Sequence, residues 1–118
     1  MGQLTTHVLD TANGCPAAGM GVTLYRIDED GRPERLHTLT LNDDGRANGP
    51  LLKGADFEAG RYRLVFEVAG YFRARGTTLP EPAFLDVVPL DFGIATPDQH
   101  YHVPLLVSPW AYSTYRGS

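Results

Sequence analysis

Hydrophobic and polar residues alternate with a period of two along most of this chain. In residues 4–10 (LTTHVLD), Val8 falls on one side of the pattern and His7 on the other. Successive side chains of a β-strand point to opposite faces, so the pattern predicts a strand with Val8 facing inward and His7 outward. Similar stretches predict further strands over residues 21–27, 36–41, 60–68, 84–92, 101–108 and 111–115.

Turn signals separate these stretches. The pair Asp44-Gly45 is typical of a tight turn and places Arg46 just beyond it. Pro89 places its strand near a sheet edge or at an irregularity, because proline cannot donate to the hydrogen-bond ladder. Only residues 69–75 (AGYFRAR) have the composition of a helix. Seven or eight short strands with almost no helix predict an all-β chain, folded as an antiparallel β-sandwich.

Composition narrows the class of protein. The 118 residues fit one domain spanning 1–118, and 42% hydrophobic residues exclude a disordered chain. No apolar run approaches the roughly 20 residues needed to cross a bilayer, so we expect no membrane partner. The net charge of -4 and the scattered basic residues leave no stripe that could bind phosphates, so we expect no nucleic acid partner.

Two local features bear on the compartment. The first ten residues lack a basic region followed by an apolar stretch, so we expect no secretory signal and a cytoplasmic protein. Cys15 is the only cysteine, which excludes an internal disulfide, and we expect it to be a plain loop thiol.

The strand predicted at 101–108 has an unusual outer face. Alternation sends Tyr101, Val103, Leu105 and Val107 to the core and His102, Pro104 and Leu106 to the other side. Apolar residues on an outer sheet face commonly mark a contact surface or a binding groove.

His7, His102 and Tyr115 are all predicted to point outward from their strands. A flat outer face cannot enclose a small molecule, because small-molecule sites are concave. Two such faces packed together would make a channel, so the pattern predicts an oligomer with its site between subunits.

The chain resembles the transthyretin-related 5-hydroxyisourate hydrolase family from Leu4 to Ser118. The resemblance rests on THVLD, DDGR, GYFRARG, HYHVPLLVSP and the terminal YRGS. It implies a prealbumin-like sandwich of two four-stranded sheets with one short helix, and a homotetramer built as a dimer of dimers. It also implies hydrolysis of 5-hydroxyisourate to 2-oxo-4-hydroxy-4-carboxy-5-ureidoimidazoline in urate degradation, without metal or organic cofactor.

By the same resemblance, five residues form the site: His7, Arg46, His102, Tyr115 and Ser118. Opening a lactam ring with water needs a base, charge stabilisation and an acid. Either histidine can act as base, and the choice between them stays open. Arg46 attracts an anionic substrate, and the Tyr115 and Ser118 hydroxyls can orient the substrate or the water. Without the resemblance, His7 and Arg46 read as ordinary surface residues.

Other chemistries fit the sequence less well. His100 and His102 project to one side and could share a zinc ion with His7, but no carboxylate or cysteine is placed to complete the set. A serine-based triad is disfavoured because Ser118 lacks a rigid elbow. Two non-catalytic functions remain as alternatives, a transthyretin-like small-ligand carrier and a prealbumin-like structural module. The two histidines and the arginine favour the enzyme over the carrier, and a structural module would not need HYHVP or the YRGS ending.

Overall fold

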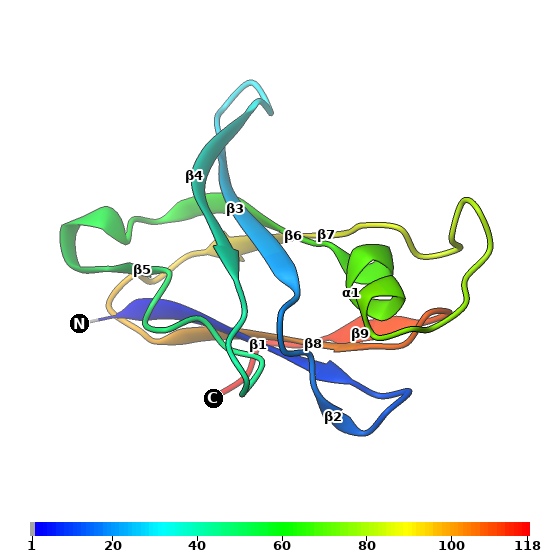
Figure 1. The fold of residues 1–118 in the computed structure, drawn as a ribbon. Helices are drawn as coiled ribbons and strands as arrows, with labels where there is room; N and C mark the ends of the chain where they lie inside the picture. The colour runs from blue at the N-terminus through cyan, green and yellow to red at the C-terminus, as the bar shows by residue number, and fades with distance from the viewer. Residues whose placement is uncertain (1) are drawn as a thin grey trace.

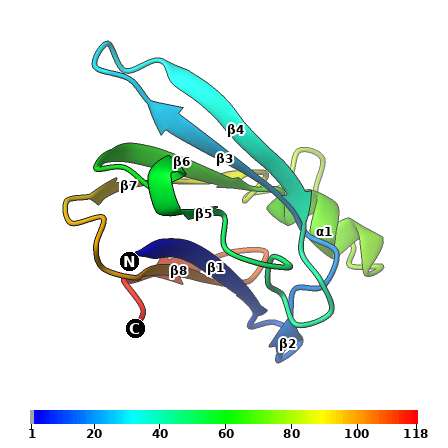
Figure 2. The same ribbon diagram turned by 90° about the vertical axis from the view of Figure 1, so that its left-hand side faces the viewer.

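Two stacked β-sheets and one short helix make up the computed structural model, which describes residues 2–118 (Figures 1 and 2). The first sheet has the order β2 (Cys15–Pro16), β1 (Gln3–Asp10), β8 (Tyr101–Val107) and β9 (Tyr112–Thr114), and β5 (Leu52–Lys53) also pairs with β1. The second sheet has the order β4 (Pro33–Thr40), β3 (Gly21–Ile27), β6 (Gly60–Phe66) and β7 (Val88–Ile94). This arrangement confirms the predicted prealbumin-like sandwich.

The short helix α1 (Val68–Ala74) follows β6 at one end of the sandwich, and a single 3-10 turn, Gly54–Asp56, precedes it in the chain. The helix differs by one residue at each end from the predicted range. No helix in residues 2–118 is both long and apolar enough to span a bilayer.

The centre of the first sheet joins two segments that are distant in sequence. β1 and β8 pair in parallel, with Thr5 opposite His102 and His7 opposite Pro104. The other strand pairs are antiparallel, as predicted, whereas antiparallel pairing was also expected for β1 and β8. The parallel pair determines which outward side chains of β1 and β8 become neighbours.

The core lies between the sheets and follows the predicted alternation, except that Pro104 on the outer face of β8 is buried as well. Along β8, Tyr101, Val103, Leu105 and Val107 are buried. They meet inward residues of the second sheet and the helix, of which the largest fully buried are Tyr62, Phe66, Phe72, Leu24 and Leu64.

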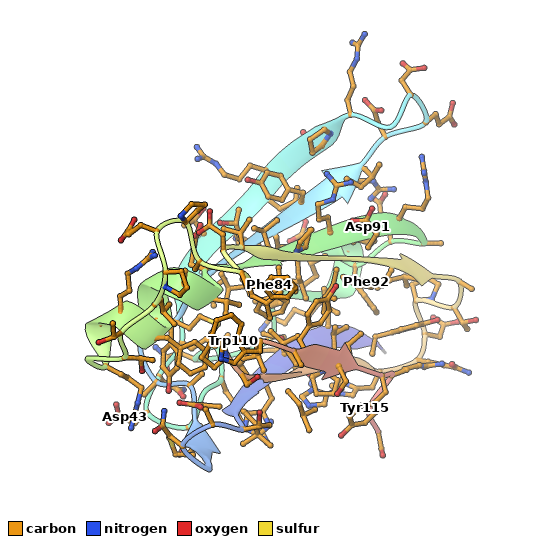
Figure 3. All side chains as sticks on the ribbon, turned by 90° about the vertical axis from the view of Figure 1, so that its right-hand side faces the viewer. Asp43, Phe84, Asp91, Phe92, Trp110 and Tyr115 are labelled. Carbon is orange, nitrogen blue, oxygen red and sulfur yellow. The ribbon has the colours of Figure 1, made fainter. Side chains whose placement is uncertain are left out.

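The strand predicted at 84–92 is displaced, since β7 begins only at Val88. The backbone carbonyl of Asp86 accepts a hydrogen bond from Ala69 N–H of the helix, which leaves the preceding residues outside the sheet. Phe84 is 70% exposed and lies beside Trp110, with ring centroids 6.1 Å apart (Figure 3). Pro89 lies in β7, an edge strand, as its chemistry predicted.

Candidate active site

Two histidines lie on the outer face of the first sheet. His7 in β1 and His102 in β8 are half-buried, and their ring centroids are 6.4 Å apart. The parallel register brings them together, because His102 is opposite Thr5 and His7 is two residues further along the same strand. Both therefore project to the same side of the sheet, as predicted.

Arg46 reaches the same face from the turn after β4. Asn42 organises this turn, since its Oδ1 accepts hydrogen bonds from the N–H groups of Asp44 and Arg46 at 2.9 and 3.1 Å. The turn then packs on β1. The N–H of Val8 donates to the carbonyl of Gly45 at 2.9 Å, and the backbones of Arg46 and His7 form an isolated antiparallel β-bridge.

Only glycine fits the docking point at residue 45. Gly45 has φ +71°, and a Cβ there would lie 2.6 Å from the Val8 carbonyl oxygen. Both conditions disfavour any other residue. The DDGR turn thus places the guanidinium of Arg46, an exposed side chain, beside the half-buried His7.

The surroundings lower the pKa of both imidazoles. Partial burial is the largest cause for each, and the positive charge of Arg46 is the next. His102 is lowered further by the neighbouring His7 and His100, whereas the backbone and charge of Asp44 act in the opposite direction on His7. The lowered pKa favours the neutral form of both histidines, which is the form that can accept a proton.

The C-terminal tail packs against His102. The N–H of Gly117 donates to the His102 carbonyl at 2.8 Å, and a Cβ at Gly117 would lie 2.7 Å from Cδ2 of the His102 ring. Arg116 anchors the tail: its guanidinium stacks 4.0 Å from the centroid of the Tyr101 ring and donates to Gln99 and to the His100 carbonyl, both at 3.1 Å.

Tyr115 and Ser118 flank this arrangement. Thr114 pairs with Leu105 and Gly117 with His102, so Tyr115 lies between these pairs, on the face that carries His102. It is 61% exposed at the end of β9 (Figure 3) and also borders a groove of about 270 Å³ with Phe92. Ser118 is exposed and follows Gly117 directly. One chain thus brings His7, Arg46 and His102 together, with Tyr115 and Ser118 at the margin.

Two further residues join the site that the sequence analysis did not assign. Thr5 contacts both His102 and His100: Thr5 Oγ1 lies 2.7 Å from His102 Nδ1 and 3.2 Å from His100 Nε2. The period of two already placed Thr5 on the face of His7, but only the β1–β8 register reveals that it is opposite His102.

The histidine face is open in the single chain. Five cavities on residues 2–118 are lined by side chains other than His7 and His102. Within the same residues, no three His, Cys, Asp or Glu side chains gather in a group that could hold a metal ion. The site therefore offers two half-buried imidazoles and one exposed guanidinium on the outer face of the first sheet.

Comparison with known proteins places this arrangement in a family. The family model described as HIUase/Transthyretin matches residues 4–117. The chain belongs to this family. A 5-hydroxyisourate hydrolase of Pseudomonas aeruginosa is 59% identical to it, over 100% of this chain and 93% of that protein.

Solved structures of two different functions share the fold. An (S)-allantoin synthase structure superposes with a TM-score of 0.93 at 51% identity. The match covers 99% of the present chain but only 44% of the longer allantoin synthase chain. Sea bream transthyretin in complex with thyroxine gives a TM-score of 0.85 at 28% identity, over 98% of this chain and 94% of the other. Fold alone therefore does not separate an enzyme from a protein that binds thyroxine, and the side chains of the site must do so.

Proposed function

We propose that this protein hydrolyses 5-hydroxyisourate to 2-oxo-4-hydroxy-4-carboxy-5-ureidoimidazoline, a step of urate degradation. The observation that carries the proposal is the convergence of two imidazoles with lowered pKa and one guanidinium on a single face. The hydrolase name of the Pseudomonas aeruginosa relative, at 59% identity over the whole chain, supports the choice of substrate.

The site can supply each part of the reaction. A neutral imidazole, from His7 or His102, takes a proton from water while the water oxygen bonds to the lactam carbonyl carbon. The guanidinium of Arg46 stabilises the negative charge that develops on the carbonyl oxygen. The carbon–nitrogen bond then breaks, and the protonated imidazole returns its proton to the leaving nitrogen. His7, Arg46 and Tyr115 also bind the substrate, and Ser118 closes the pocket with its hydroxyl. No cofactor enters this scheme.

A carrier function is the second candidate, since sea bream transthyretin binds thyroxine on the same fold. Binding an apolar ligand needs an apolar lining. Here the half-buried His7 and His102 and the exposed Arg46 present polar and cationic groups instead. The chemistry of this face therefore favours a reaction on a polar substrate.

We further propose that the protein is a homotetramer, a dimer of dimers, whose sites lie between subunits. His7 and His102 lie half-buried on the outer side of one chain, and two such faces packed together would form the concave site that a small substrate needs. The exposed Trp110 and Tyr112, at 59% and 45%, offer apolar surface for such contacts. We place the protein in the cytoplasm, where reducing conditions suit its free thiol, Cys15.

The direct test is to generate 5-hydroxyisourate from urate with urate oxidase and follow its decay spectroscopically. We expect the protein to accelerate decay above the uncatalysed rate, and light scattering to give four times the mass of one chain. Thyroxine binding by calorimetry, together with an uncatalysed decay rate, would instead support the carrier.

A further inference from the structure

We propose that Thr5 is a positioning residue: its hydroxyl group keeps the proton of neutral His102 on Nδ1 and leaves Nε2 free to accept a proton. The catalytic consequence rests on the proposed hydrolase function. The hydrogen-bond geometry is independent of that function, because it comes from the contacts of three side chains on the outer face of the first sheet.

The geometry is a short chain of hydrogen bonds across two strands. Thr5 in β1 is paired with His102 in β8, and Thr5 Oγ1 lies 2.7 Å from His102 Nδ1. The same oxygen lies 3.2 Å from Nε2 of His100, which precedes β8. Thr5 is therefore shared by two imidazoles whose ring centroids are 6.4 Å apart.

Counting protons limits the hydrogen bond between Thr5 and His102 to two arrangements. A threonine hydroxyl has one proton and two lone pairs, so it can donate to one ring nitrogen at most, and it can accept from one or both. Either Thr5 donates to His102 and accepts from His100, or it accepts from His102 Nδ1–H and sends its own proton to His100 Nε2 or to solvent. The two arrangements place the proton of neutral His102 on opposite ring nitrogens.

Only the second arrangement suits a base that gains and loses a proton. In it, Nε2 of His102 carries the free lone pair. When Nε2 takes a proton from water, Nδ1–H already donates to Thr5, so every hydrogen bond of the chain persists. In the first arrangement, protonation of His102 would put a second donor against the Thr5 hydroxyl proton and break the chain. We therefore take His102 as the base and Nε2 as the nitrogen that receives the proton.

The other groups that face His102 are consistent with this assignment. Arg46 is cationic and cannot accept a hydrogen bond from Nδ1. His7 does not replace Thr5 as the acceptor, because the Thr5 hydroxyl already lies 2.7 Å from Nδ1. From the tail, Gly117 meets the ring at carbon Cδ2, and the Arg116 guanidinium binds the His100 carbonyl. Thr5 is thus the hydroxyl that holds the Nδ1 side of the ring.

The test compares Thr5→Val, which removes the hydroxyl at nearly constant shape, with Thr5→Ser, which keeps it. We expect Thr5→Val to lower kcat by about 10- to 100-fold with KM changed by less than about threefold, and Thr5→Ser to restore most of kcat. The matched control is Thr11→Val. It removes a hydroxyl that donates only to the Val107 carbonyl, at 3.1 Å, and we expect it to leave kcat unchanged.

A second measurement reads the tautomer without a variant. In ¹⁵N NMR spectra of the wild-type protein at a pH where His102 is neutral, we expect its Nδ1 to be protonated and its Nε2 not, and we expect the tautomers to mix in Thr5→Val. A protonated Nε2 in the wild type, or a wild-type kcat in Thr5→Val, would overturn the proposal. If the wild-type protein does not hydrolyse 5-hydroxyisourate, the proposed function fails, while the NMR spectra still decide the role of Thr5.

Discussion

Strand β1 carries two polar clusters, one on each face, and they are built in opposite ways. On the inner face, the fully buried carboxylate of Asp10 accepts hydrogen bonds from the Tyr71 hydroxyl at 2.7 Å and from the side chain and backbone of Asn13 at 2.7 and 2.9 Å. On the outer face, His7 lies half-buried between His102 and the Arg46 guanidinium.

The difference appears in the direction of the pKa shifts. Burial raises the pKa of Asp10, but the hydrogen bonds from Asn13 and Tyr71 outweigh it and leave the pKa lowered, so the carboxylate stays charged and satisfied. Burial and the Arg46 charge lower the pKa of His7 and His102, which favours the neutral form that can accept a proton. Complete pairing on one face holds α1 to the sheet, and incomplete pairing on the other leaves groups free for a substrate.

The contrast between the two faces of β1 fails if the outer cluster proves to be structural. We expect His102→Ala or Arg46→Ala to lower kcat/KM about 10²- to 10⁴-fold, because each removes a group that acts in the reaction. Urea denaturation and light scattering should show stability and assembly unchanged. His37→Ala is the matched control: His37 is exposed on β4 of the other sheet, and its loss should leave the rate intact. Dissociation of the His102 variant would mean that the residue holds subunits together.

Substitution in the inner cluster should lower the stability of the fold and leave the reaction rate unchanged. We expect Asp10→Ala to cost about 1–3 kcal/mol in the free energy of unfolding, because Tyr71 and Asn13 lose their buried acceptor. Urea denaturation measures this change. The folded variant should keep its kcat. Asp91→Ala removes a 60% exposed carboxylate that pairs with Arg63 and should have a smaller effect on stability. A large loss of kcat in stable Asp10→Ala protein would erase the distinction between the faces.

The tail tests how tightly the outer cluster is held. We expect Gly117→Ala to reduce kcat about tenfold, since the added Cβ would lie 2.7 Å from Cδ2 of His102 and must displace the ring or the tail. Gly93→Ala is the control, because a Cβ at this β7 glycine meets no other atom within 4 Å. Steady-state kinetics on both variants separates the effects, and equal rates would show that the tail yields without moving the ring.

The smallest expected effect is a shift in pH dependence. We expect an NMR titration to give His102 a pKa below its ordinary value of about 6.5. The acid limb of the pH profile of kcat/KM should also lie below that pH. Arg46→Gln removes a positive neighbour, so both should move toward higher pH. Arg63→Gln, on the other sheet, should move neither. The unfolded chain binds these protons more readily than the folded one, so stability should decline as the pH falls below about 6.5.

Much of this arrangement follows from local pattern. The period of two gave the inward and outward faces of β1 and β8, and Asp44-Gly45 gave the turn that presents Arg46. The predicted start of β7 was wrong by four residues, because the hydrogen bond from the Ala69 N–H of α1 to the Asp86 carbonyl is a tertiary contact that the alternation of residues does not reveal. The roles of Thr5 and His100 were missed for the same reason, since they depend on the register between distant strands.

The parallel pairing of β1 with β8 also determines the order of assembly. Thr5 and His102 are 97 residues apart, and closing so large a loop carries an entropy cost that hairpins such as β3–β4 avoid. Refolding chains should therefore form the second sheet early and the catalytic surface late. The recovery of turnover should then lag behind the recovery of β-strand content.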